Sequence, residues 1–297
     1  MSRGRDFHGN DEAMNDSATR ALAASATRLA PTAATACRID ARRVHSLLGP
    51  QSRRFTVEAL SECVSTNTVL LERAVQGAAS GSVLVADRQT AGRGRRGRSW
   101  LSTPEASLTF SLLWRFEGSV ARLAGLSLAV GLAVARGLAN SGVGGVGLKW
   151  PNDILLAGGK VGGILVDLEA AAASTLAVIG IGLNLQLPPD GDEEFLHRPA
   201  ALAQVMASVP DRQQLLAQVL TELAEIMDRF ADGGFAALRS DWQTYHVWQG
   251  RQVRLLDGAL VDRRGLCLGA DSDGALLLQT DAGIERCLSG DVSLRAA

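Results

Sequence analysis

The chain has 297 residues and a formal net charge of −1, with 46% hydrophobic and 21% charged residues. This length is enough for one large domain, or a medium domain and a small one, around a sizeable core. The near-zero charge argues against a dedicated nucleic-acid or membrane-surface binder. No apolar run of about 18 residues and no secretory signal is visible. Four scattered cysteines form no CxxC pair, which argues against a structural zinc site or a disulfide framework and favours a reducing, cytoplasmic location.

The first half of the chain predicts a tail followed by helices and strands. Residues 1–40 are rich in Ala, Ser, Thr, Asn and Asp, which is typical of a disordered extension. Beyond it, caps, apolar spacing and short apolar runs predict a short helix at 40–50, a helix through 68–78 capped by Ser65 or Thr66, strands at 83–86 and 107–114, and a long helix at 119–140. The short helix is too small for a DNA-binding helix-turn-helix, which needs about sixty ordered residues.

The second half predicts more strands, two helices and a small β-structure. Three strand-like runs follow the long helix, at 146–150, 159–169 and 175–187, and Gly158-Gly159 suggests a hairpin between the first two. Amphipathic helices are expected at 215–230 and 235–242. Short alternating runs after 247 are typical of a small all-β barrel. We therefore expect a mixed α/β fold with a catalytic domain at 41–246 and a barrel at 247–297.

The segment RQTAGRGRRGRSW (88–100) contains five arginines, three glycines and no acid. Arginine supplies planar donors for phosphate or carboxylate, and glycine lets the backbone fold closely around a ligand. An anion-binding loop is favoured over a solvated basic face for this reason. The G-x-G-x-x-G match within it is misleading, because no apolar helix follows the glycines as a dinucleotide fingerprint requires.

Only two of the 30 basic residues are lysines, Lys149 and Lys160, and both lie in KWPNDILLAGGK. This bias suggests that both positions need a compact ammonium, although chance proximity is the alternative. Lys160 stands next to glycines, where it can reach a ligand anion. No Ser, Cys or His constellation for nucleophilic catalysis is present. Cations around phosphates without a protein nucleophile indicate nucleotidyl or phosphoryl transfer.

GRGRRGRSW (92–100) together with KWPNDI (149–154) closely resembles the two signature motifs of bacterial biotin protein ligases. Supporting matches are Ser65-Thr66-Asn67, Gln89, GIGLNL (180–185) and the terminal SGDVSLR, so that the resemblance covers about residues 55–297. The resemblance implies a mixed α/β catalytic domain related to lipoate ligases and a C-terminal SH3-like barrel. It also implies that biotin and Mg-ATP give biotinyl-5′-AMP and pyrophosphate, after which a lysine of a biotin carboxyl carrier protein takes the biotinyl group.

The resemblance also implies roles for individual residues. Lys160, Arg95 and Asp153 would be catalytic, with Lys160 on the biotin carboxylate and Asp153 positioning Lys160 or polarising the incoming amine. The residues implied to bind biotin are Ser65, Thr66, Asn67, Gln89, Arg93, Gly94, Arg95 and Lys160. The residues implied to bind ATP or the adenylate are Arg93, Arg96, Arg98, Trp100, Lys149, Asn152 and Asn184. Magnesium would arrive with ATP, near Asn184.

Two other functions remain as alternatives, a lipoate or octanoate ligase of the same fold and a non-catalytic sensor of biotinyl-AMP. We expect neither repressor activity nor DNA binding, because the segment before residue 55 is short, and we expect no membrane association. The carrier protein of acetyl-CoA carboxylase is the expected acceptor. A homodimer is possible through a free edge of the catalytic sheet. The barrel either braces the site or meets the carrier.

Overall fold

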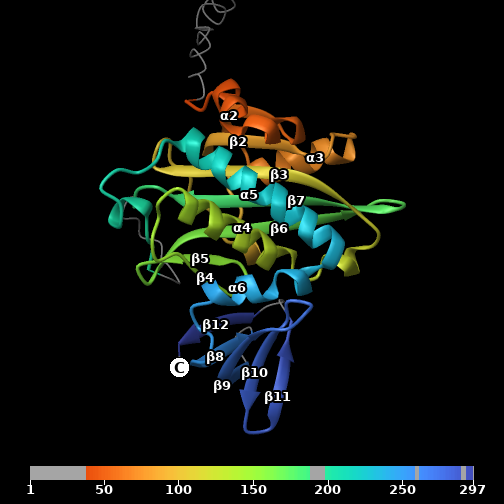
Figure 1. Ribbon diagram of the computed structural model, residues 1–297, viewed down its shortest axis with the longest axis vertical. Helices are drawn as coiled ribbons and strands as arrows, with labels where there is room; N and C mark the ends of the chain where they lie inside the picture. Colours follow the sequence, from red (N-terminus) through yellow and green to blue (C-terminus); the bar gives the residue numbers. More distant parts are fainter. Residues whose placement is uncertain (1–37, 188–197, 258–260, 289–291, 297) are drawn as a thin grey trace, which may run out of the picture. The chain divides into compact units, whose positions relative to one another are not determined.

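The computed structural model describes residues 38–187, 198–257, 261–288 and 292–296 (Figure 1). A disordered extension is predicted for residues 1–40. Residues 1–37 of it lie outside the described part of the chain. The predicted domain boundaries at 41–246 and 247–297 are not tested by the structure and stay a prediction.

A seven-stranded mixed sheet forms the centre of the catalytic part, with the order β1-β2-β3-β7-β6-β5-β4. β1 and β2 are parallel, and every other neighbouring pair is antiparallel. The strands are β1 (Thr56–Cys63), β2 (Ser82–Gln89), β3 (Ser107–Glu117), β4 (Gly147–Lys149), β5 (Asp153–Leu156), β6 (Gly159–Ala170) and β7 (Ser174–Asn184). The predicted mixed α/β fold is confirmed.

Helices cover both faces of this sheet, since side chains on a strand alternate between the two faces. The helices are α2 (Ala41–Leu48), α3 (Thr66–Val75), α4 (Leu126–Asn140), α5 (Arg212–Gly233) and α6 (Arg239–Tyr245). On β3, Leu112 belongs to the main core with α4 and α5, which lie across one face in Figure 1. Its neighbour Leu113 packs with Leu70 of α3 and Val178 of β7 on the opposite face.

The prediction of one helix over 119–140 is wrong at its start. A short 3-10 turn (Val120–Leu123) comes first, and α4 begins only at Leu126. Gly125 between them has a left-handed φ of 80°, and a Cβ there would lie 2.6 Å from Phe235. The segment Val120–Asn140 is long and apolar enough to cross a membrane by length and composition, but 67% of its apolar window is buried inside the protein. It therefore occupies the position of a core helix.

The predicted hairpin is present, but its turn and partners differ from the prediction. β5, which the sequence analysis did not predict, pairs with β6, and Ala157 and Gly158 form the turn rather than Gly158 and Gly159. Both turn residues have positive φ, 49° and 78°, as a two-residue hairpin turn of this twist requires. β1 and the later strand β11 were also missed.

The C-terminal part is an antiparallel sheet with the order β11-β10-β9-β8-β12, as expected for a small SH3-like barrel. Its strands are β8 (Gln252–Asp257), β9 (Val261–Ala270), β10 (Leu276–Thr280), β11 (Gly283–Cys287) and β12 (Val292–Ala296). Val253, Leu276 and Leu278 are buried in it. The indole of Trp150, in the turn between β4 and β5, donates to the Gly274 carbonyl of this sheet at 3.0 Å.

We predict that the ion pair between Arg212 of α5 and Asp87 of β2 contributes strongly to stability. Nη1 of Arg212 lies 2.8 Å from Oδ1 of Asp87, and the two side chains are 10% and 6% exposed. In Arg212→Met the buried carboxylate loses its charged partner, so the free energy of unfolding falls by about 3 kcal/mol. Urea unfolding measures it. Arg43→Met is the control, because Arg43 is half exposed and its pair with Asp211 is worth at most about 1 kcal/mol. Equal losses in the two variants would contradict the prediction.

Candidate active site

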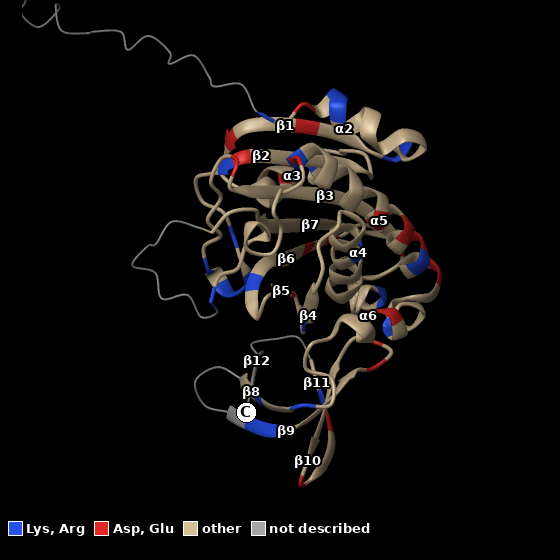
Figure 2. Cartoon of the chain, turned by 60° about the vertical axis from the view of Figure 1, so that its left-hand side comes forward, with Lys and Arg blue, Asp and Glu red and all other residues tan. Residues whose placement is uncertain are grey.

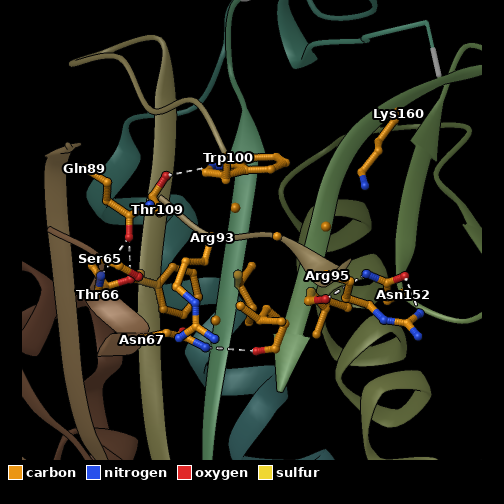
Figure 3. Close-up of a pocket in the computed structure, with 18 residues that line it drawn as sticks. Ser65, Thr66, Asn67, Gln89, Arg93, Arg95, Trp100, Thr109, Asn152 and Lys160 are labelled. Carbon is orange, nitrogen blue, oxygen red and sulfur yellow. Dashed lines mark hydrogen bonds between the residues drawn. The ribbon is translucent and has the colours of Figure 1, made fainter. Parts of the chain in front are cut away.

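One pocket lies where the loop 88–100, the start of α3 and the strands β3, β6 and β7 meet (Figure 3). Residues from separate parts of the sequence line it, and they include ten of the predicted site residues: Ser65, Thr66, Asn67, Gln89, Arg93, Gly94, Arg95, Trp100, Asn152 and Lys160. The fold thus brings together the arginine-rich loop, the Ser-Thr-Asn segment and Lys160. The lining residues that the sequence analysis did not single out include Thr109, Phe110, Gly163, Ile164 and Leu165, whereas Gly180, Ile181 and Gly182 come from the supporting match GIGLNL, to which no role was assigned.

The polar end of the pocket is a buried hydrogen-bond network. Oε1 of Gln89 accepts from the backbone N–H of Thr66 at 2.7 Å and from its hydroxyl at 3.1 Å. The Ser111 hydroxyl contacts Oγ1 of Thr66 at 2.7 Å and Oδ1 of Asn67 at 2.5 Å. Ser65 occupies the N-cap position of α3, where its side chain does not cap the helix. These groups hold one another in fixed positions, as recognition of a polar ligand group requires.

Bare backbone on β7 creates the space for two of the lining side chains. Gly180 pairs with Ser111 of β3, and a Cβ at Gly180 would lie 2.2 Å from Oδ1 of Asn67. Gly182 pairs with Thr109, and a Cβ at Gly182 would lie 2.3 Å from the indole of Trp100, whose Nε1 contacts Oγ1 of Thr109 at 3.4 Å. The alternation of small and apolar residues in SLTFSLL is the sequence signal that could have identified the β3 positions, while the glycines of β7 lie in the supporting match GIGLNL.

The arginine-rich loop folds back on itself and reaches across the sheet. The N–H of Trp100 donates to the Gly92 carbonyl at 2.9 Å, and the N–H of Gly94 to the Arg98 carbonyl at 2.7 Å. Nη1 of Arg93 lies 3.4 Å from Oδ2 of Asp167, an acid on β6 that the sequence analysis missed and that also accepts from Asn67 at 3.1 Å. These contacts tie the loop to the floor of the pocket.

Arg95 is the second link between the loop and the sheet. Its Nη1 donates to Oδ1 of Asn152 at 3.2 Å, and Nδ2 of Asn152 donates to the Ile164 carbonyl at 2.8 Å. Arg96 and Arg98 lie outside the pocket and line a larger hollow beside the start of α4. Figure 2 shows several separate blue, basic stretches of chain beside β6. The loop can therefore present charge to two adjacent spaces.

Lys160 opens β6 and points toward the pocket in Figure 3. Its Nζ lies 2.5 Å from Oδ1 of Asp153, and the Lys149 ammonium lies 3.4 Å from Oδ2 of the same carboxylate. Asp153 is 8% and Lys149 4% exposed. Lys149 and Asp153 are not among the residues that line the pocket, and Asn184, whose Nδ2 donates to the Ala200 carbonyl at 3.1 Å, is not either.

Within the described residues the site offers no activated protein nucleophile and no metal cluster. Cys63 lies at the end of β1, two residues before Ser65, and burial together with the neighbouring Glu62 raises the pKa of its thiol to about 11. The thiol is therefore protonated at neutral pH and unreactive. No group of three or more His, Cys, Asp or Glu side chains is arranged to hold a metal ion in the described part of the chain. What the pocket supplies is donors and positive charge.

Two family models match the chain: "Biotin/lipoate A/B protein ligase family" over residues 60–184 and "Biotin protein ligase C terminal domain" over residues 250–295. The chain is 36% identical over 262 residues to the bifunctional ligase/repressor BirA of Salmonella typhimurium, covering 87% of this chain and 79% of that protein. It is 34% identical over 251 residues to the biotin--[acetyl-CoA-carboxylase] ligase of Mycobacterium tuberculosis, covering 83% of this chain and 91% of the relative.

The fold is similar to that of the biotin protein ligase from Aquifex aeolicus in complex with biotin and ATP. The TM-score is 0.69 at 32% sequence identity, and the match covers 82% of this chain and 99% of the Aquifex chain. Sequence, fold and the convergence of the two signature motifs on one pocket agree, and we conclude that this chain belongs to the biotin protein ligase family.

Proposed function

We propose that this biotin protein ligase activates biotin with ATP and then transfers the biotinyl group to a lysine of a biotin carboxyl carrier protein. In the first step a carboxylate oxygen of biotin attacks the α-phosphorus of ATP, and the bond to the β-phosphate oxygen breaks, releasing pyrophosphate. In the second step the neutral lysine amine attacks the acyl carbon of biotinyl-5′-AMP, the bond from this carbon to the phosphate oxygen breaks, AMP leaves, and the new amide nitrogen loses a proton to solvent. The observation that carries this proposal is the pocket with a neutral polar network at one end and Lys160 beside it.

The reaction needs no nucleophile from the protein, because the biotin carboxylate is the attacking group. Its main obstacle is the approach of two anions, which fixed positive charge stabilises in the transition state. We assign the Lys160 ammonium to the biotin carboxylate and the developing charge on the α-phosphate. The neutral network of Ser65, Thr66, Asn67 and Gln89 suits the uncharged ring system of biotin, and the loop residues Arg93, Gly94 and Arg95 close over it.

For ATP we propose that Trp100 and Asn152 contact the nucleotide from the pocket, while Arg96 and Arg98 contact it from the adjacent hollow. Asn184 ends β7, where its amide nitrogen bonds the Ala200 carbonyl, and we propose its amide oxygen as a ligand for magnesium. Magnesium bound to the phosphates would neutralise charge on the leaving group. The predicted contact of Lys149 with ATP fits the structure poorly, because Lys149 is buried against Asp153.

The remaining assignments rest on the relatives. By analogy with the Mycobacterium tuberculosis enzyme, we propose that the acceptor is the biotin carrier of acetyl-CoA carboxylase. A cytoplasmic location, a homodimer and the lack of DNA binding stay predictions. Lipoate or octanoate ligation is not favoured, since the named relatives are biotin ligases.

We predict that Lys160→Ala lowers the rate of biotin-dependent ATP–pyrophosphate exchange by at least about a hundredfold, because the transition state loses its fixed positive charge. Exchange is measured with biotin, lipoate and octanoate added separately. Arg115→Met is the control, since Arg115 bonds Ser174 on an exposed part of β3 and β7. Exchange that requires lipoate and does not occur with biotin would show that the protein is a lipoate ligase instead. Tight biotin binding without any exchange would indicate a sensor.

We predict that Gly182→Ala weakens biotin binding about tenfold, because the new methyl group displaces Trp100 from the wall of the pocket. Calorimetric titration with biotin measures the affinity. Gly144→Ala is the matched control, since a Cβ at Gly144 has no neighbour within 4 Å. Unchanged affinity in Gly182→Ala would show that Trp100 does not shape the biotin site.

A further inference from the structure

Asp153 connects the only two lysines of the chain. It lies on β5 directly opposite Lys149 of β4, and its two oxygens are shared between Lys149 at 3.4 Å and Lys160 at 2.5 Å. Asp153 and Lys149 are almost completely buried, whereas the side chain of Lys160 is 27% exposed. A buried carboxylate between two ammonium groups is held from both sides, so a change at Lys149 alters how Asp153 holds Lys160.

Lys149 is in turn held by the segment that leads into the C-terminal barrel. Its Nζ lies 5.7 Å from the centroid of the Trp248 ring, within the range of a cation–π interaction. The backbone of this segment is fixed to β4, because the N–H of Val247 donates to the Leu148 carbonyl at 3.0 Å. Gly147 permits this close approach, since a Cβ there would lie 2.2 Å from Val247. The position of Trp248 is therefore set by the edge of the catalytic sheet.

Among the described residues near Trp248, Lys149 is the cation that lies over its ring. His246 is buried against Trp242 in the same segment, and burial lowers the pKa of its imidazole to about 4, so it is neutral at neutral pH. Arg198 and Arg251 line a hollow together with Lys149, Lys160 and Trp248, but both arginines are exposed. Lys160 lines this hollow and the pocket, so it stands at the boundary between the two.

We infer that Lys149 and Trp248 are positioning residues for Lys160: Trp248 holds the ammonium of Lys149, Lys149 holds one oxygen of Asp153, and the other oxygen of Asp153 holds Lys160 in place for adenylation. This inference rests on the proposed function and deepens it. It gives the segment that leads into the barrel a role in the chemistry.

The effect should be found in kcat rather than in KM. A misplaced Lys160 still attracts the biotin carboxylate in the ground state, but it loses contact with the charge that develops in the transition state. Lys149→Met keeps the aliphatic stem and removes the charge. We expect it to lower kcat of biotin-dependent ATP–pyrophosphate exchange about tenfold, while the KM for biotin changes less than about threefold.

Trp248 provides the independent test. Trp248→Leu should lower kcat about threefold, whereas Trp248→Phe, which keeps an aromatic face, should stay close to the wild type. In the double variant Lys149→Met/Trp248→Leu the second change should have no further effect, because no charge is left for the ring to hold. Arg251→Met is the matched control: it removes one positive charge from the same hollow and should stay within about twofold of the wild type.

A second measurement does not depend on ligase activity. Because the chain has only two lysines, the rate at which an amine-acylating reagent modifies Lys160 can be followed by peptide mass spectrometry. In Lys149→Met the buried Asp153 carboxylate is no longer shared with the ammonium of Lys149 and pairs more strongly with Lys160, so we expect acylation of Lys160 to slow at least about twofold, with no change in Arg251→Met. Thermal unfolding of each variant establishes that it is folded.

The inference is overturned if Lys149→Met retains kcat and Lys160 acylation at the wild-type level, if Arg251→Met loses as much as Lys149→Met, or if the two losses multiply in the double variant. If Lys149→Met does not fold, equal rates for Trp248→Leu and Trp248→Phe overturn it. Wild-type protein without biotin-dependent exchange would defeat the proposed function instead, and the acylation rates would still decide the positioning role.

Discussion

In the function we propose, positive charge has to meet two anionic substrates, and the buried carboxylate of Asp153 holds the lysine side chain that carries it. Asp153 is 8% exposed and lies 2.5 Å from Lys160 and 3.4 Å from Lys149. Lys160 lines the pocket together with the arginine-rich loop and the start of α3. Its partly buried ammonium is oriented by Asp153, which in the role we propose for Lys160 leaves little reorganisation for the reaction.

The sheet supplies the second requirement, a shaped wall on one face and a packed core on the other. On β3 and β7 the apolar residues of one face meet α4 and α5, while Thr109, Ser111, Gly180 and Gly182 share the opposite face. Where that face meets the middle of α3 it is packed with Leu70, and toward the start of α3 the small residues leave room for Asn67 and Trp100. The same strands thus stabilise the fold and form the floor of the site.

Several parts of the fold were predictable from local patterns. These patterns act over a few residues, which is the range that sequence patterns report. They are the N-cap position and apolar spacing of α3, the apolar runs of β2 and β3, and the alternation in the C-terminal strands. β1, β5 and β11 were missed because their apolar content is low or their length is short. The break at Gly125 was missed because its cause, the approach of Phe235, is more than a hundred residues away in the sequence.

The sequence by itself determined the chemical class of the site, because its motifs contain the groups that are suited to contact anions: arginines among glycines and two lysines in a chain that otherwise uses arginine. Only the tertiary structure decided which of these groups are buried and which line a pocket. It buries Lys149 against Asp153 and Trp248, leaves Lys160 at the pocket, and directs Arg96 and Arg98 to a neighbouring hollow. The physical reason is that burial and pairing depend on strand register and on chain segments far apart in sequence, which no local pattern encodes.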